Sequence, residues 1–314
     1  MLEGQQTTIN IVTACDNAYV QHTAIFLKSL FKSNPNIKCR VFVMVPNNFV
    51  HRASLKRNLG RFGENIEFLS ADLSKASSLK VSHQVTVATY FRLLLDKLVP
   101  EDIQRIIYMD SDILVAGALQ ELWATDLENY AVAAAIDAIA DMEFSVREKI
   151  GLARTSHYFN AGVLLIDLRR WKNEKLGERA LAFAVECPKR LTWWDQCALN
   201  HVLSGRFKVL AKEWNFQTDH LHCSEGGKPS VEALRELAAA KIVHFTGPLK
   251  PWYYFNEHPM KWLYWKLLRE TEWRRYCPPD RTGRDVLKRN LKHRAPALLN
   301  AIHRARKLWR QALG

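Results

Sequence analysis

The sequence predicts an α/β protein, because strand and helix patterns alternate along its first third. Residues 8–14 (Thr-Ile-Asn-Ile-Val-Thr-Ala) are rich in β-branched side chains and predict a strand, followed by a helix that runs to about Phe31. A strand over 39–45, a helix near 49–59 and a strand at 66–69 continue the alternation, which favours a sheet with right-handed crossovers. Neither a Gly-x-Gly-x-x-Gly nor a Walker sequence follows the first strand, so the chain lacks a dinucleotide fingerprint and a P-loop.

A second observation is the acidic pair within residues 106–115, Ile-Ile-Tyr-Met-Asp-Ser-Asp-Ile-Leu-Val. In extended chain Asp110 and Asp112 point to the same side. At the end of a buried strand they would repel each other and lose solvation unless a cation lies between them. A divalent metal that also contacts a diphosphate would resolve this conflict. The alternative is a strand that ends in a polar turn, where Asp and Ser are common.

The later elements continue the α/β pattern. A helical apolar pattern covers 87–98, and within it a lone Arg92 is more typical of a solvated or snorkelling side chain than of a ligand contact. Asp137 ends a strand of small residues. Further predicted elements are a helix at 197–203, strands at 131–136, 163–166 and 241–243, and a helix that begins with 167–171; residues 119–123 follow the acidic pair without an assigned type.

Two polar residues lie where a ligand of such a sheet would bind. Asp16 follows the first strand and would either receive a nucleotide base or ribose or cap the next helix. His244 follows a short strand, where histidine is commonly structural, but an imidazole beside two carboxylates suits Mn²⁺ better than Ca²⁺. Gly247 permits close approach of the backbone to a ligand, and Lys250 supplies a point charge for phosphate oxygens.

Composition excludes several classes of protein. The chain has 314 residues, 48% of them hydrophobic, and no apolar run approaches the roughly 20 residues that a membrane span needs. Residues 1–6 lack the basic-then-apolar form of a signal peptide. The six cysteines form no C-x-x-C pair, which argues against a zinc cluster or a disulfide framework and suits a reducing compartment.

The basic charge is concentrated in the tail. Residues 280–314 hold ten Lys/Arg and two Asp, so they contribute +8 of the net charge of +13. Apolar residues recur there at helical spacing, which is typical of a helix lying in an anionic membrane interface; they are Leu298, Ile302, Ala305, Trp309 and Ala312. The alternatives are a solvated basic helix docked on its own domain and a nucleic-acid tail. No interleaved stacking aromatics support nucleic-acid binding.

Six motifs in a fixed order make the chain similar to glycosyltransferase family 8, the retaining sugar-nucleotide transferases with a GT-A fold. Within that family it most resembles the bacterial lipopolysaccharide galactosyl- and glucosyltransferases. The match runs from about residue 8 to 255 and is carried by residues 13–19 (TACDNAY), 89–93 (TYFRL), 108–112 (YMDSD), 159–162 (FNAG), 194–196 (WDQ) and 244–252 (HFTGPLKPW).

The resemblance implies a role for each motif. Asp110, Asp112 and His244 would hold Mn²⁺, or alternatively Mg²⁺, against the diphosphate of a UDP-sugar. Gly247 and Lys250 would meet the diphosphate. The uridine would lie against Ala14, Asp16 and Tyr19. The remaining substrate-binding positions are Arg92, Ser111, Asp137, Asn160, Asp195 and Gln196. Asp195 and Gln196 would also be catalytic, with Gln196 nearest the anomeric centre.

The predicted protein is therefore a GT-A catalytic domain with a Rossmann-like mixed sheet over 7–265 and a basic helical extension over 266–314. It would transfer glucose or galactose from a UDP-sugar to a saccharide or glycolipid acceptor, with lipopolysaccharide core as the expected one, at the inner face of the cytoplasmic membrane. Because an amide is a poor nucleophile, a front-face route is favoured over a covalent one. A glycogenin-like or protein-directed glucosyltransferase and a metal-dependent UDP-sugar hydrolase remain alternatives.

Overall fold

A computed structural model of the chain describes residues 8–73, 79, 86–221, 229–283 and 286. The chain forms two compact units, residues 1–248 and residues 249–314. The division predicted from the sequence, a catalytic domain over 7–265 and an extension over 266–314, stays a prediction. The predicted tail helix falls almost wholly outside the described residues.

The first unit is built on a mixed sheet with the strand order β3-β2-β1-β4-β7-β6-β8. β1 is parallel to β2 and β4, whereas β7 is antiparallel to both β4 and β6. This arrangement confirms the predicted α/β class with a mixed central sheet. The strands are β1 (Thr8–Ala14), β2 (Lys38–Pro46), β3 (Ile66–Ala71), β4 (Arg105–Met109), β6 (Val132–Ile136), β7 (Phe159–Asp167) and β8 (Lys208–Leu210).

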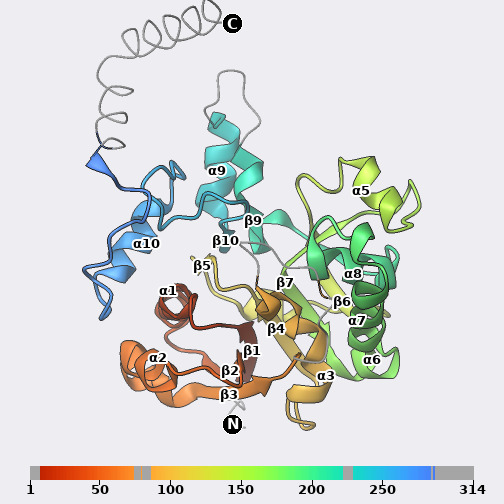
Figure 1. The fold of residues 1–314 in the computed structure, drawn as a ribbon, viewed down its shortest axis with the longest axis horizontal. Coiled ribbons are helices and arrows are strands. Elements are labelled where there is room, and N and C mark those ends of the chain that lie inside the picture. The colour runs from red at the N-terminus through yellow and green to blue at the C-terminus, as the bar shows by residue number, and fades with distance from the viewer. Residues whose placement is uncertain (1–7, 74–78, 80–85, 222–228, 284–285, 287–314) are drawn as a thin grey trace, which may run out of the picture. The chain divides into compact units, whose positions relative to one another are not determined.

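Both faces of the central strands are covered. Neighbouring residues such as Ile11 and Val12 are fully buried although their side chains point to opposite faces, which explains the continuous apolar runs of these strands. Figure 1 shows α1 and α2 beside the strands at the start of the chain and α6, α7 and α8 grouped near β6 and β7. The α-helices of this unit are α1 (Val20–Ser33), α2 (Arg52–Leu59), α3 (Leu95–Leu98), α4 (Gln120–Ala124), α5 (Phe144–Lys149), α6 (Leu168–Asn173), α7 (Leu176–Glu186), α8 (Trp194–Leu203) and α9 (Val231–Ala239).

A small second sheet brings distant segments together. It consists of β5 (Ile113–Val115), β10 (Ile242–His244) and β9 (Phe216–Gln217), in the order β5-β10-β9. β10 runs antiparallel to β5, so that His244 lies opposite Ile113, and the N–H of Phe245 donates to the carbonyl of Asp112 at 3.1 Å. The register of this pairing therefore places His244 beside the acidic pair.

Three predicted elements differ from the structure. Residues 87–98 form a 3-10 helix (Val87–Leu94) before the single turn of α3, since an apolar pattern does not distinguish the two helix types. β7 begins at Phe159, four residues earlier than predicted, because all of residues 159–166 are buried in the sheet. α8 begins at Trp194, so that Asp195 and Gln196 lie within the helix rather than before it.

The second unit contains α10 (Lys261–Leu268) and a turn that is held by two charged side chains. Nζ of Lys261 donates to the carbonyls of Tyr253, Tyr254 and Asn256 at 2.6, 2.9 and 3.0 Å. The carboxylate of Asp280 accepts from the backbone N–H groups of Tyr254 and Phe255 at 2.7 and 3.0 Å. Asp280 therefore belongs to the structure of this unit.

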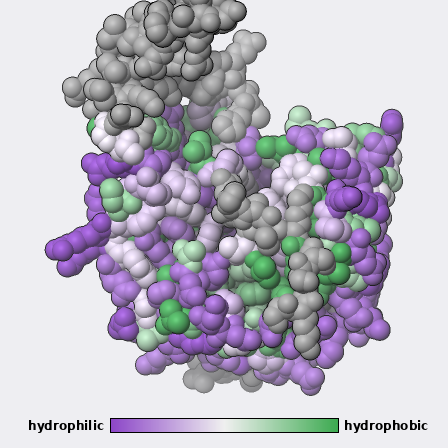
Figure 2. Space-filling model, in the orientation of Figure 1, coloured by the Kyte–Doolittle hydropathy of each residue, from purple (hydrophilic) through white to green (hydrophobic). Residues whose placement is uncertain are grey.

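The described residues give no sign of a membrane-crossing segment, since none of their helices has both the length and the apolar content that a bilayer span requires. Figure 2 shows hydrophilic residues over much of the face in view, with apolar residues in smaller patches between them.

Candidate active site

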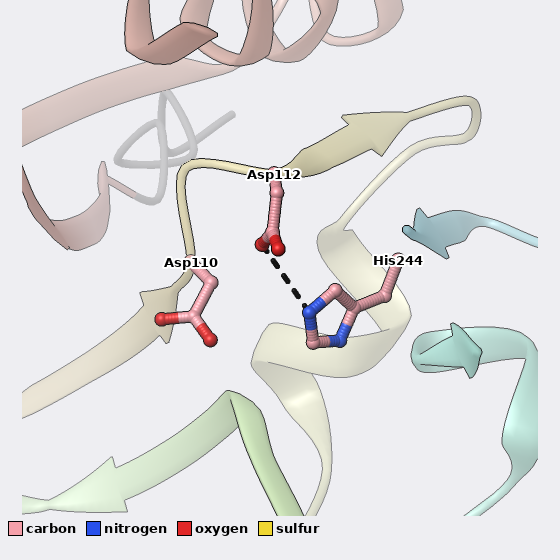
Figure 3. A group of neighbouring side chains, drawn as sticks. All are labelled: Asp110, Asp112 and His244. Atoms are coloured by element: carbon pink, nitrogen blue, oxygen red, sulfur yellow. Dashed lines mark ion pairs between the residues drawn. The ribbon is translucent and has the colours of Figure 1, made fainter. Parts of the chain in front are cut away.

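Three side chains with metal-ligand chemistry meet where β4 ends. Asp110 and Asp112 lie in the turn between β4 and β5, and His244 ends β10. One ligand atom from each lies within 4.8 Å of the others, and Nε2 of His244 is 3.3 Å from Oδ1 of Asp112. Figure 3 shows the three side chains converging on one point. The acidic pair thus occupies a polar turn, not extended chain, and yet faces the histidine as the metal hypothesis requires.

These residues fit a divalent cation. Two carboxylates and one imidazole suit Mn²⁺ and related ions. Burial raises the pKa of the Asp110 carboxyl, the Arg92 guanidinium opposes that shift, and the negative charge of Asp112 adds to it. A cation bound between the carboxylates would relieve both the burial cost and the repulsion. We therefore describe Asp110, Asp112 and His244 as a candidate metal site.

Arg92 is a buried bridge, so its interpretation as a solvated or snorkelling residue is wrong. Its side chain is 5% exposed, because carboxylates compensate its charge inside the protein. Nη2 lies 2.7 Å from Oδ1 of Asp110, Nε lies 2.8 Å from Oδ2 of Asp195, and Nη1 donates to the carbonyl of Ala161. Burial lowers the pKa of Arg92, but Asp110 and Asp195 more than reverse this effect and hold it above its usual range.

A second polar cluster joins Asp137, Asn160 and Gln196. Oδ2 of Asp137 accepts from Nδ2 of Asn160 and from Nε2 of Gln196, both at 3.0 Å. Its Oδ1 accepts from the backbone N–H groups of residues 139 and 140. Oε1 of Gln196 accepts from the N–H of Ala161 at 2.9 Å. Asp137, Asn160 and Gln196 are thus joined by hydrogen bonds. Arg92, a fourth residue predicted to bind the sugar, is connected to them because it donates to the carbonyl of Ala161.

The predicted uridine-side residues lie around the start of α1. Oδ1 of Asp16 accepts from the N–H groups of Ala18 and Tyr19, and its Oδ2 accepts from Thr86 at 2.7 Å. Asp16 therefore shapes the loop that precedes α1. Oγ of Ser111 donates to the carbonyl of Ala14 at 2.7 Å, which ties the acidic turn to β1. Contacts of these residues with a substrate stay predictions.

The two predicted diphosphate residues belong to different units. Gly247 has φ of +77°, a conformation that favours glycine. Apart from its two chain neighbours, no described residue has an atom within 4 Å of the position that a Cβ would take there. Lys250 lies in the second unit. Its assignment to the diphosphate stays a prediction.

The sequence did not reveal several residues that support these groups. Thr89 donates to Oδ1 of Asp195 at 2.6 Å, and Tyr108 donates from its hydroxyl to Oδ1 of Asp110 at 3.1 Å. Thr89 and Tyr108 lie in two of the six motifs, but other residues of those motifs are the ones predicted to form the site. Asn215, whose Oδ1 is 3.0 Å from Nδ1 of His244, carries no motif at all. Only the pairing of β9 with β10 brings it to the site.

A mixed α/β sheet with an acidic pair after β4, and a histidine that the small second sheet brings beside this pair, is the arrangement of a GT-A-like fold. The solved structure of the galactosyltransferase LgtC, in complex with donor and acceptor sugar analogs, has this fold with a TM-score of 0.75. The two proteins are 24% identical, and the similarity covers 87% of this chain and 98% of that one.

The model of glycosyl transferase family 8 matches residues 10–256, and the chain belongs to this family. It is therefore a glycosyltransferase of the hexosyltransferase type. It is 30% identical to general stress protein A of Bacillus subtilis, over 84% of this chain and 94% of that protein. It is also 24% identical to a lipopolysaccharide 1,2-glucosyltransferase of Escherichia coli, over 91% and 85%, and 25% identical to a lipopolysaccharide 1,3-galactosyltransferase of Salmonella typhimurium, over 84% and 79%.

Proposed function

We propose that this enzyme transfers glucose or galactose from a UDP-sugar to a saccharide acceptor of lipopolysaccharide core, with Mn²⁺ as its cofactor. The observation that carries the proposal is the convergence of Asp110, Asp112 and His244 at the end of β4, beside the Asp137 cluster. The names of the E. coli and Salmonella relatives support the hexose and the acceptor.

In this proposal the residues around the candidate metal site bind the nucleotide part of the donor. Asp110, Asp112 and His244 would hold the cation, which when bound supplies Lewis-acid stabilisation of the charge on the departing diphosphate. Gly247 and Lys250 would contact the same diphosphate. Asp16, with Ala14 and Tyr19, would hold the uridine, and Ser111 would keep the acidic turn against β1.

The sugar-side residues favour a front-face route to retention. A double displacement needs a carboxylate or similar group that is free to attack the anomeric carbon. Both oxygens of Asp137 accept hydrogen bonds, and the two oxygens of Asp195 face Thr89 and Arg92. Gln196 is held at both ends of its amide. These contacts support a positioning role for Gln196 and Asp195, with departing phosphate assisting deprotonation of the acceptor.

The tail completes the proposal. We assign residues 280–314 to the anionic inner face of the cytoplasmic membrane, where a glycolipid acceptor would be presented. The support is the charge of +8 on these residues together with the helical spacing of their apolar side chains. No nucleic acid is part of the proposed function.

The test is a panel of UDP-sugars assayed with Mn²⁺, first for hydrolysis and then with lipopolysaccharide core acceptors. We expect UDP-glucose or UDP-galactose to be consumed, the rate to rise with the acceptor, and EDTA to abolish it. Sugar release that no acceptor stimulates would instead indicate a hydrolase. Incorporation of sugar into protein would indicate a glycogenin-like or protein-directed glucosyltransferase. Full turnover in EDTA would overturn the metal assignment.

A further inference from the structure

A continuous line of side-chain hydrogen bonds joins the Asp137 cluster to the candidate metal site. Nδ2 of Asn160 donates to Oδ2 of Asp137 at 3.0 Å. Oδ1 of Asn160 is 2.9 Å from Nδ2 of Asn215, and Oδ1 of Asn215 is 3.0 Å from Nδ1 of His244. Asn160, Asn215 and His244 are at most 5% exposed, so water does not compete for these bonds.

The donor and acceptor of every hydrogen bond in this line follow from groups that can only donate or only accept. The backbone N–H of Gly162 donates to Oδ1 of Asn160 at 2.9 Å, so this atom is the amide oxygen. The facing atom of Asn215 must then be its NH₂ group, which leaves its oxygen toward His244. An amide oxygen only accepts, so Nδ1 of His244 carries a hydrogen and donates it. Nε2 is left to face the two carboxylates.

Gly162 provides the space that the His244 ring occupies. A Cβ at residue 162 would lie 2.2 Å from Cε1 and 2.6 Å from Nδ1 of His244. The ring thus occupies space that only glycine leaves open. The carbonyl of Gly162 also accepts from the N–H of Asp110 at 2.9 Å, so one residue of β7 supports both sides of the candidate metal site.

We propose that Asn215 is a positioning residue that keeps His244 protonated on Nδ1 and so directs Nε2 at the metal ion. Through Asn160, the same residue couples the metal ligand to the side chains assigned to the donor sugar. The inference rests on the metal site of the proposed function. It extends that site to Asn215, which precedes β9.

The test compares two substitutions of Asn215 by Mn²⁺ titration, with free Mn²⁺ followed by electron paramagnetic resonance. Asn215→Leu removes the acceptor for Nδ1, and we expect Mn²⁺ to bind roughly 10–100-fold more weakly, the usual effect of losing such a partner. Asn215→Asp keeps an acceptor toward His244, but it replaces the donor toward Asn160 by an acceptor and adds a negative charge. We expect its Mn²⁺ affinity to lie between those of the wild type and Asn215→Leu.

A matched control separates positioning from general packing. Asn200 is also buried, and its side chain makes three hydrogen bonds, to Phe159 and the carbonyl of Gln196, against the two of Asn215; none of the three involves His244. Asn200→Leu should lower the melting temperature by an amount similar to Asn215→Leu while leaving Mn²⁺ affinity near that of the wild type. Equal Mn²⁺ affinity in wild type and Asn215→Leu would overturn the inference.

A second measurement does not depend on the stability of any Asn215 variant. In metal-free wild type labelled with ¹⁵N-histidine, the His244 signals, assigned by their absence in His244→Gln, should show a hydrogen on Nδ1. An unprotonated Nδ1 would overturn the inference with the proposed function intact. Failure of the wild type to bind Mn²⁺ at all would overturn the proposed function and the inference together, so the two failures are distinguishable.

Discussion

Nη2 of Arg92, a buried side chain, lies 2.7 Å from Oδ1 of Asp110 in the candidate metal site. The same guanidinium faces Asp195 on α8 at 2.8 Å. The buried Arg92 guanidinium therefore compensates the charge of two carboxylates, one in the turn after β4 and one on α8. Removing it would leave Asp110 and Asp195 with hydrogen bonds from Tyr108 and Thr89 but with no positive charge beside them, which costs more than the loss of an exposed ion pair. Arg92 thus links the candidate metal site to Asp195 on α8.

We predict that Arg92→Ala destabilises the fold by about 3–5 kcal/mol, the usual cost of removing one partner of a buried ion pair. Urea unfolding followed by circular dichroism would measure it. Arg169→Ala is the control, because the Arg169 side chain is largely exposed and its loss should change stability by less than about 0.5 kcal/mol. Arg92→Lys should recover part of the stability but little activity, since an ammonium cannot serve both carboxylates and a carbonyl. Equal stability of the two alanine variants would contradict this view of Arg92.

The longer strands of the sheet can be predicted from the sequence, whereas some contacts of the candidate site cannot, and the reasons are physical. Strand β1 is rich in β-branched residues and β2 contains a continuous apolar run, and both features are visible without a structure. β9 has two residues and β8 has three, too few for any pattern. The environment of Arg92 could not be inferred either, because its partners lie 18 and 103 positions away along the chain. Side chains such as Asn215 acquire their role only from strand pairing.

The acidic pair yields a prediction about metal dependence. Asp112→Asn keeps the shape of the side chain but removes one charge from the candidate metal site. We expect turnover of the UDP-sugar to fall by roughly 10²-fold or more, because a metal ligand is lost. The apo protein should be no less stable, since repulsion with Asp110 is relieved. Asp102→Asn, at an exposed position, is the matched control and should keep full activity. Wild-type turnover in Asp112→Asn would refute the assignment.

Gln196 gives a prediction about stereochemistry. Its amide is held by Ala161 and Asp137, so it is placed to orient a sugar rather than to attack it. Gln196→Ala should lower kcat by roughly 10²-fold, as loss of one positioned polar group commonly does, while the product keeps its anomeric configuration. NMR of the early product reports the anomer. A covalent sugar adduct trapped on Gln196 or Asp195 of the wild type would show the front-face route to be wrong.

Cysteine reactivity is predicted to follow burial. Burial raises the pKa of the Cys15 thiol to about 12, with a smaller opposing hydrogen bond to Thr23, and raises that of Cys39 to about 11. A raised pKa means that these thiols stay protonated at pH 9, so they should resist iodoacetamide there. Cys277 is exposed and should react. Peptide mass spectrometry would measure the pattern, and urea should make Cys15 react. Labelling of Cys15 in the folded protein at the rate of Cys277 would contradict the buried site.

The last prediction concerns the tail, and the structure decides where to cut it. The sequence alone suggests truncation after Pro279, but the carboxylate of Asp280 holds the backbone of Tyr254 and Phe255. A shortened chain that ends at Gly283 keeps this contact. It still lacks nine Lys/Arg and one Asp of the tail, a charge of +8. At about 1 kcal/mol for each basic residue near an anionic surface, several such contacts would hold the enzyme reversibly at a membrane.

We therefore expect the truncated enzyme to lose co-sedimentation with phosphatidylserine vesicles while hydrolysing UDP-sugar as before. Added salt should weaken binding of the full chain, because the attraction is partly screened. A full-length variant separates the effect of charge from that of length; in it Gln replaces Arg304, Arg306, Lys307 and Arg310. The substitution Trp309→Ser tests the apolar face that would orient the helix in the surface plane. Undiminished co-sedimentation of the truncated enzyme would refute the anchor. Unfolding on truncation would instead support a tail helix docked on its own domain.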